Sequence, residues 1–207
     1  VPGEPNFGRP YEFRAGANTP VDFFESQVIK RNSIALTGGS ELATFRFGYT
    51  NHNQDDILPN SELERHVFNF NGTVKMSEKL SADVMMQYSK QNAVGRFSTG
   101  YTDNLMSQFR QWWQVNVDVK QQEAVYKRTG LNYTWNGASH DTPLTPIYWD
   151  NPYWTRYENF NSDTRDRMLT KFGFSYKLTD WLTANGRISL DHYKAVREER
   201  RAVGSVP

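Results

Sequence analysis

Aromatic side chains are the residues of this 207-residue chain with the clearest capacity for chemistry. Five of its six tryptophans fall between Arg110 and Tyr157, with several tyrosines among them. Rings of this kind stack on sugars and peptide groups, and Trp and Tyr dominate recognition surfaces. The segment therefore predicts a contact surface for a ligand or a partner. The candidate contact residues are Trp135, Tyr148, Trp149, Tyr153, Trp154 and Tyr157.

The same rings also allow a structural interpretation, because a long segment outside a sheet needs a small core of its own. The stretch DNLMSQFRQWWQ at 103–114 has its apolar residues at helical spacing, with Asp103 as a possible N-cap. We expect Trp112 and Trp113 to belong to such a core. For the box DNPYW at 150–154 both interpretations stand, and its Asn and Pro indicate a turn that fixes the rings.

Other candidate chemistry is sparse. The chain has no cysteine, and therefore no disulfide, thiolate ligand or thiol nucleophile. Its four histidines, His140 among them, lack the spacing of a metal motif, and Asp55 with Asp56 lacks the rest of a calcium loop. There is no nucleophile elbow or phosphate-binding glycine loop. We expect no enzyme activity, no metal and no cofactor. The net charge of +1 also gives no overall attraction to nucleic acid.

Period-two alternation predicts six strands that must position the aromatic segment. In KFGFSYKLTDWLTANGRISLDHY, near the end of the chain, apolar residues alternate with polar or small ones on both sides of a tight turn. Four earlier strands, at about 27–37, 42–50, 65–76 and 80–89, repeat the pattern. The residues expected to share the apolar side, and to face lipid if the sheet spans a membrane, are Phe45, Phe47, Phe68, Phe70, Val84, Met86, Phe172, Phe174, Ile188 and Leu190.

The connections favour a membrane β-barrel. Turns within the three hairpins are short, whereas one link is very long, and this asymmetry is typical of bacterial outer-membrane barrels. The strands approach the length of a tilted membrane crossing, and Tyr49, Tyr88 and Tyr176 fall where an aromatic girdle would lie. A soluble β-sandwich with one large insertion is the alternative.

We therefore predict an all-β fold, a transmembrane antiparallel β-barrel of which about six strands are present. Its expected parts are a loop leading into the barrel (1–26), four strands in two hairpins (27–89), a long extracellular segment with a short helix (90–165), and a hairpin with the start of the next loop (166–207).

Several stretches resemble the barrel region of SusC/RagA-type TonB-dependent transporters of Bacteroidota outer membranes. They are the NPVDFF-like residues 18–24, the GG-E-TFR-YTN hairpin at 38–51, ILPNS at 57–61 and DNPYW at 150–154. The resemblance implies a plugged barrel of about 22 strands in the outer membrane of a Gram-negative bacterium. It also implies a SusD-like surface lipoprotein as lid, energy from the TonB complex, and import of oligosaccharides or peptides. The aromatic segment could then receive the lid.

The sequence departs from that family by lacking a plug, a TonB-contacting segment and a C-terminal strand that ends in an aromatic residue. Six strands cannot close a barrel of this kind, and an open edge cannot face lipid. We therefore expect an internal portion of a longer polypeptide. Two alternatives remain: a SusC-like barrel that acts as a scaffold in an outer-membrane assembly, and a soluble secreted β-rich module that binds glycan through its tryptophans.

Overall fold

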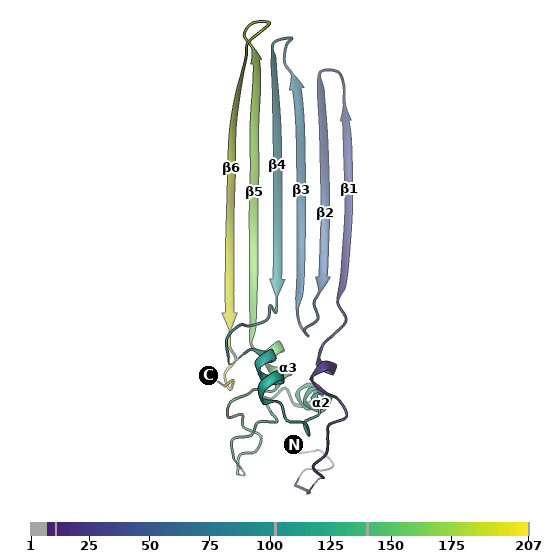
Figure 1. Cartoon of the computed structure of the whole chain (residues 1–207), viewed down its shortest axis with the longest axis vertical. Coiled ribbons are helices and arrows are strands. Elements are labelled where there is room, and N and C mark those ends of the chain that lie inside the picture. Colours follow the sequence, from purple (N-terminus) through teal and green to yellow (C-terminus); the bar gives the residue numbers. More distant parts are fainter. Residues whose placement is uncertain (1–7, 11, 102, 140, 207) are drawn as a thin grey trace.

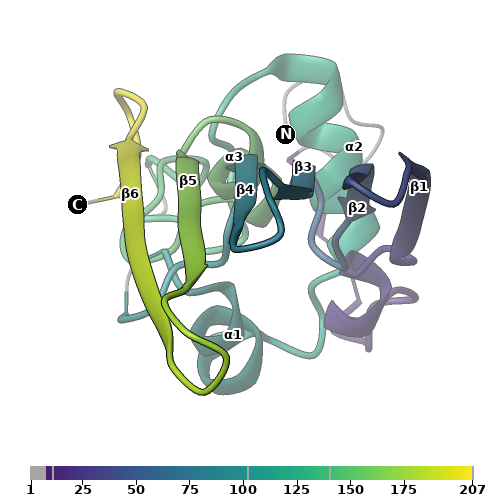
Figure 2. The same cartoon turned by 90° about the horizontal axis from the view of Figure 1, so that it is seen from above.

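The computed structural model of the chain describes residues 8–10, 12–101, 103–139 and 141–206. Its main body is a six-stranded antiparallel sheet whose strands lie side by side in chain order (Figures 1 and 2). Within the described residues the sheet is open, and β1 and β6 form its edges. The strands are β1 (Val28–Gly39), β2 (Ala43–Asp55), β3 (Glu62–Lys75), β4 (Leu80–Val94), β5 (Phe160–Lys177) and β6 (Thr183–Arg200). The prediction of antiparallel β structure is confirmed, and closure into a barrel is not observed.

The strands extend further than the alternation pattern indicates. β4 continues to Val94 and β5 begins at Phe160, so the long connection covers 95–159 instead of 90–165. Residues added at these ends, such as Lys90–Asn92, are polar on both faces of the sheet. A strand that meets water on both faces has no period-two pattern, which is why its ends were not visible in the sequence.

A cap of short helices and loops lies at the end of the sheet opposite the three hairpin turns (Figure 1). Each described helix is too short and too polar to span a membrane. Residues 1–7 and 11 of the predicted loop 1–26, and His140, lie outside the described residues. The cap helices are η1 (Pro20–Phe23), α1 (Leu105–Ser107), η2 (Gln108–Trp112), α2 (Val119–Thr129) and α3 (Pro152–Tyr157).

The helix expected over 103–114 is present as two short turns, α1 and the π-helical η2. Its N-cap is Asn104 and not Asp103, because the Asn104 side chain accepts hydrogen bonds from two backbone N–H groups of the first turn. Asp103 forms an ion pair with Arg201 instead, at 2.5 Å. Helices α2 and α3 were not predicted.

The cap has its own hydrophobic core, assembled from segments that are distant in the sequence. Phe23 and Tyr153 are fully enclosed and meet edge to face, with ring centroids 4.9 Å apart. Phe109 contacts Phe23 from the side of η2, at 5.0 Å. Buried core members come from η1, the β2–β3 loop, α1, α2 and α3: Phe23, Leu58, Leu105, Val119 and Tyr153. These contacts fix the cap as one packed unit.

A buried arginine joins the cap to the sheet. The Arg156 guanidinium donates from Nε to the Pro59 carbonyl at 2.8 Å and from Nη2 to the carbonyls of Asn60 (3.4 Å) and Gly95. In return, Asn60 Nδ2 donates to the Arg156 carbonyl at 2.9 Å. Asn60 and Gly95 both have positive φ, at 53° and 70°. This group ties α3 to the β2–β3 loop and to the exit of β4, and we call it the arginine junction.

Gly95→Ala is expected to destabilise the arginine junction by about 2 kcal/mol or more. An added Cβ would lie 1.9 Å from the Asn60 carbonyl oxygen, and the backbone is left-handed there. Gly130→Ala is the matched control, since Gly130 also has positive φ (64°) but has open space around its Cβ position. Chemical unfolding of both variants should show the larger loss for Gly95→Ala. Equal losses would mean that backbone strain alone matters.

Candidate functional site: the two faces of the sheet and the cap

One face of the sheet carries all ten residues predicted to face lipid. Directly opposed residues of an antiparallel pair lie on the same face, and the register opposes Phe47 to Phe70 and Phe70 to Met86. Val84 is likewise opposed to Phe172, and Phe172 to Ile188. The face includes Phe45, Phe47, Phe68, Phe70, Val84, Met86, Phe172, Phe174, Ile188 and Leu190, together with Ile34, Leu36, Val74, Ala82 and Met168. We call this region the apolar band, and none of these side chains is charged.

The apolar band ends within a single cross-strand row on the side of the cap. The last row contains Tyr49, Phe68 and Tyr88, which are neighbours through the register. On β6 the same row holds His192, so there the apolar side chains end one row earlier, at Leu190. The next row toward the cap contains only polar residues: Asn32, Asn51, His66, Lys90, Asp166 and Lys194. The sheet therefore changes from apolar to polar over two residues per strand.

The two tyrosines of the last row connect the apolar band to this polar row. The Tyr49 hydroxyl is hydrogen-bonded to His66 Nδ1 at 2.8 Å, and the Tyr88 hydroxyl donates to Asp166 Oδ1 at 2.9 Å. Each ring thus lies among apolar side chains while its hydroxyl reaches the polar row. Tyrosine has this arrangement where one end of the ring is apolar and the other is wet.

The height of the apolar band matches a bilayer. From Leu80 to Tyr88 along β4 the rise is about 27 Å at ~3.4 Å per residue, and outer-membrane barrels carry an apolar belt of about 25 Å. The band is exposed, with Ile188 at 71% of its full accessible area. A continuous apolar surface over six strands is larger than the patches that soluble monomers normally expose.

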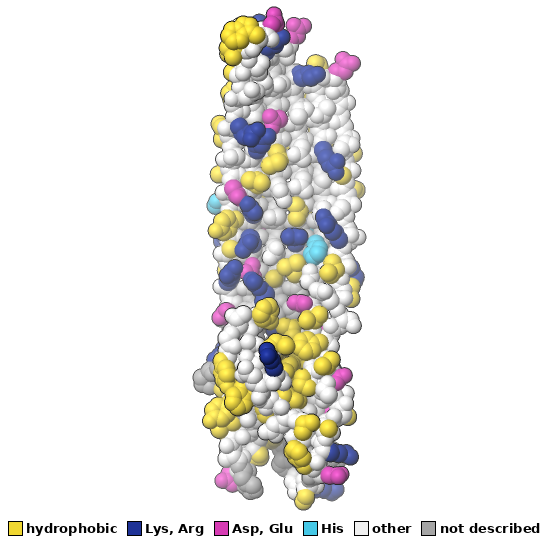
Figure 3. Space-filling view, in the orientation of Figure 1, with side chains coloured by type: hydrophobic (Ala, Val, Ile, Leu, Met, Phe, Trp, Pro, Cys, Tyr) yellow, Lys and Arg dark blue, Asp and Glu magenta, His cyan; other side chains and the backbone are white. Residues whose placement is uncertain are grey.

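The opposite face is polar, and Figure 3 shows it with few hydrophobic side chains over the strands. On β4–β6 several of its charges are paired: Lys171 Nζ lies 3.2 Å from Asp83 Oδ2. Arg167 forms a two-point contact with Asp191, at 2.5 and 2.8 Å. The two faces together fit a wall with a dry side and a hydrated side.

The six candidate contact rings separate into buried and exposed groups. Trp149, Tyr153 and Trp154 are buried, and Tyr153 retains only 1% of its accessible area. Because their ring faces are covered by the cap, we assign these three to its core rather than to a ligand surface. Tyr148 and Tyr157 are exposed, so ligand or partner contact stays a prediction for these two.

Trp135 is half-buried and packs on Trp113 with ring centroids 5.4 Å apart. Trp113 also meets Phe109 at 5.1 Å, which confirms its place in the core. Trp112 does not share that place, because about half of its surface is exposed. Contact of a ligand with Trp135 also stays a prediction, limited to the ring face that Trp113 leaves free.

The DNPYW box is a helix N-terminus held by buried hydrogen bonds. Asn151 is completely buried and its Oδ1 accepts from the Tyr153 N–H at 2.9 Å, which caps α3, with Pro152 at the first helical position. Asn151 Nδ2 donates to the Gln122 and Tyr133 carbonyls at 3.0 and 2.9 Å. The structural interpretation of this box therefore accounts for its Asn and its Pro.

Burial perturbs ionisable groups in this part of the cap. Desolvation raises the pKa of the Asp150 carboxyl, against hydrogen bonds from Asn132 and the Val206 N–H that lower it. Burial likewise raises the pKa of the Tyr153 phenol and lowers the pKa of the Arg156 guanidinium. Burial is the largest cause of each of these three pKa shifts, so they follow from packing. Among the described residues no three His, Asp or Glu side chains form a group that could hold a metal ion.

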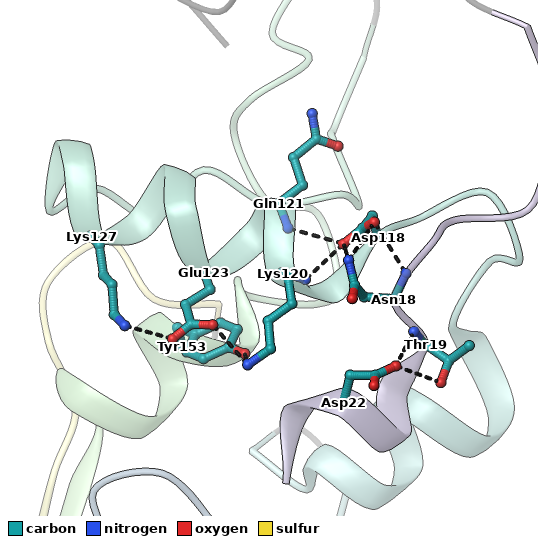
Figure 4. A network of polar contacts seen from close by, with 9 residues as sticks. All are labelled: Asn18, Thr19, Asp22, Asp118, Lys120, Gln121, Glu123, Lys127 and Tyr153. Atoms are coloured by element: carbon teal, nitrogen blue, oxygen red, sulfur yellow. Dashed lines mark hydrogen bonds and ion pairs between the residues drawn. The ribbon is translucent and has the colours of Figure 1, made fainter. Parts of the chain in front are cut away.

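A second polar network holds the N-terminal segment against α2 (Figure 4). The Asp118 carboxylate caps α2, accepting from the Lys120 and Gln121 N–H groups at 2.9 and 3.1 Å. It also accepts from the Asn18 backbone N–H at 3.1 Å and from Asn18 Nδ2 at 2.9 and 3.0 Å. Burial raises the pKa of Asp118, but the hydrogen bonds outweigh it and leave the pKa below its ordinary value.

Asp118→Asn is expected to weaken the cap by about 1 kcal/mol at pH 7, because charge-assisted hydrogen bonds are replaced while the N-cap is kept. The lowered pKa means that ionised Asp118 stabilises the fold above its unfolded-state pKa. This contribution is lost as the pH falls through the lower folded-state pKa, so the difference between variant and wild type should vanish in strong acid. Tryptophan fluorescence during unfolding at pH 3 to 7 measures it. A difference that persists unchanged at pH 3 would contradict the assignment.

Sequence reasoning missed Asp118, Asn60 and Arg156. A signal existed for Asp118, since an Asp followed three residues later by Gln is an N-terminal helix signature. For Arg156 no local signal exists, because its partners lie about 60 and 97 residues away in the chain.

No protein-family model matches the chain, and a comparison with curated proteins finds no match either.

Proposed function

We propose that this chain forms part of the β-barrel wall of an outer-membrane transporter. The observation that carries the proposal is the apolar band: an uncharged belt about 27 Å high (at ~3.4 Å per residue) on one face of six strands, bounded by hydrogen-bonded tyrosines. Water-soluble proteins bury such a face, whereas a barrel wall presents it to lipid. The opposite face would line a hydrated lumen.

The open edges of the sheet set a condition on this proposal. Unpaired N–H and C=O groups cannot face hydrocarbon, so β1 and β6 must pair with further strands in the membrane. The three hairpin turns would lie on the periplasmic side and the cap outside the cell, because outer-membrane barrels have short periplasmic turns and long extracellular loops. The polar strand segments between the band and the cap would project into water.

The resemblance to SusC/RagA transporters gives the proposal its finer content. On that basis the barrel imports oligosaccharides or peptides across the outer membrane of a Gram-negative bacterium, energised through TonB. A SusD-like lipoprotein would cover the cap, where Tyr148 and Tyr157 are exposed. A soluble glycan-binding module would leave the apolar band in water, and the band therefore favours the membrane proposal.

Single-cysteine labelling tests the orientation. The 207 residues contain no cysteine, and any cysteine elsewhere in the native protein would first be replaced by serine. We would introduce Ile188→Cys and Leu190→Cys in the apolar band, and Tyr148→Cys on the cap. Intact cells would then be treated with a membrane-impermeant maleimide. We expect labelling at 148 and protection at 188 and 190. After detergent solubilisation in the presence of a small maleimide, all three positions should react.

Rapid labelling of positions 188 and 190 in intact membranes would overturn the proposal, because it would place water and not lipid at the band. Recovery of the native protein in a detergent-free soluble fraction would have the same consequence. Protection at 188 and 190 with no labelling at 148 in intact cells would keep the membrane proposal but reverse the assigned orientation of the cap.

A further inference from the structure

A row of basic side chains crosses three neighbouring strands on the polar face. Arg31 of β1 is directly opposed to His52 of β2, and His52 to Arg65 of β3. Adjacent strands are about 4.8 Å apart, so the outer two backbone positions of the row are separated by about 10 Å. The row thus places two guanidinium groups on the same face, with a histidine between them.

The basic row lacks any local neutralising group. On the polar face of β1–β3, the described strands carry Arg31, Arg46, His52, Arg65 and Lys75, and no Asp or Glu. Neither Arg31 nor Arg65 has a hydrogen-bond or ion-pair partner among the described residues, and Arg46, six residues further from the cap than His52 on β2, has none either. The only partner of the His52 ring in this part of the structure is Gln54 Oε1, at 3.3 Å.

The other half of the same face shows the contrast. There Lys171 is paired with Asp83 and Arg167 with Asp191. The buried Asp163 carboxylate accepts from both Arg96 (2.8 Å) and Arg197 (2.9 Å). Carboxylates thus accompany the cations of β4–β6 at several points, while the cations of β1–β3 face the hydrated side without any. On β5 and β6 the strand arginines Arg165 and Arg187 also lack an ion-pair partner among the described residues, but carboxylates lie on their part of the face, whereas β1–β3 carry none there.

The basic row also borders a hollow of about 320 Å³ on this face. Arg31, His52 and Arg65 line it, together with hydroxyl and amide side chains of Thr50, Asn69 and Gln87. Guanidinium groups bind carboxylate, sulfate and phosphate through paired N–H donors, and amides and hydroxyls supply further donors. The hollow therefore combines cationic and neutral donors around a space that can hold an anionic group.

We propose that the Arg31–His52–Arg65 hollow binds an anionic group of the transported molecule, a carboxylate, sulfate or phosphate, as it passes along the lumen wall. This inference rests on the proposed function, because the transported molecule reaches the hollow only if the polar face lines the lumen. It deepens that function by naming the substrate class: acidic rather than neutral molecules. A cationic wall without local carboxylates also raises the local concentration of anions.

The test uses the native full-length protein, extracted from membranes and folded in detergent. Binding of inorganic phosphate, tri-galacturonate and tri-glutamate is measured by calorimetry at low salt, with neutral maltotriose as the uncharged probe. The double variant Arg31→Gln/Arg65→Gln removes the guanidinium pair. The double variant Arg165→Gln/Arg187→Gln is the matched control, since it removes two arginines of the same face on β5 and β6 that are also without a described ion-pair partner.

We expect at least one of the acidic probes to bind the wild type. Its affinity should fall about tenfold or more in Arg31→Gln/Arg65→Gln, as for the loss of charge-assisted hydrogen bonds, and change less than threefold in the control. Equal losses of affinity in both double variants would mean that binding depends only on the overall charge of the face, and would overturn the inference. The inference would also fail if no acidic probe bound the wild type, or if Arg31→Gln/Arg65→Gln kept the wild-type affinity.

The calorimetry and the cysteine labelling test different claims, so failure of the anion-binding inference can be distinguished from failure of the proposed function. Site-specific anion binding together with a water-exposed apolar band would keep the binding site and reject the transporter. A lipid-covered band without site-specific anion binding would reject only this inference.

Discussion

Ile188→Arg is expected to lower the stability of the membrane-inserted protein by about 2–4 kcal/mol, the cost of a cation near the midplane of the lipid face of a barrel. Ile188 lies in the central row of the apolar band, opposite Phe172 and about midway between the Tyr88 and Leu80 levels. It is 71% exposed, so in water the same substitution would remove little packing. A change at such an exposed site in a soluble protein stays within about 0.5 kcal/mol.

The measurement is the folded fraction in outer membranes, followed by urea unfolding in lipid vesicles. Asn185→Arg is the matched control: it introduces the same cation on the same strand but on the polar face, opposite Ser175. We expect Asn185→Arg to assemble as the wild type does. If Ile188→Arg assembles equally well, the apolar band does not face hydrocarbon and the proposed function fails.

Arg156→Met is expected to destabilise the cap by about 2–4 kcal/mol, because it leaves buried carbonyls without their donor. Arg156 is almost completely buried and its partners are the Pro59, Asn60 and Gly95 carbonyls. Methionine fills similar space and carries no charge. Burial lowers the pKa of the Arg156 guanidinium, because its charged form is costly to bury. Removing this cost offsets part of the stability lost with the hydrogen bonds, and therefore limits the expected destabilisation.

Hydrogen exchange of residues 95–159 is the appropriate measurement, since the arginine junction connects this segment to the sheet. Arg156→Lys should be intermediate, because an ammonium group on a single stem cannot reach three carbonyls in the guanidinium geometry. Arg110→Met applies the same change to an exposed arginine and should alter stability by less than about 0.5 kcal/mol. Wild-type protection in Arg156→Met would show that the junction is not a structural anchor.

The sheet could be predicted wherever its two faces meet different surroundings. Between Leu80 and Tyr88, for example, apolar and polar residues alternate at every position except Met85, and the structure places the two sets on opposite faces. Beyond Tyr88 the alternation stops at Lys90, although β4 continues to Val94. There both faces are polar, so hydrogen bonding to β3 and β5 extends the strand where side-chain pattern gives no signal.

The cap was less predictable, because its contacts join distant segments. A group of tryptophans and tyrosines between 110 and 157 is equally consistent with a small core and with a binding surface. Only the packing of Phe23 and Phe109 against Tyr153 decides that this ring is covered. Tyr148, four residues before Pro152, is left outside, and nothing in the spacing of the two tyrosines distinguishes them.

By itself, then, the sequence determined that six amphipathic strands form with short turns at one end, because a period of two is a local property of a strand with one apolar face. The tertiary structure decided which strand ends extend beyond the apolar band, which rings are buried, and how Arg31, His52 and Arg65 come into one row. These features depend on register and on contacts between residues far apart in the chain, and no local pattern encodes them.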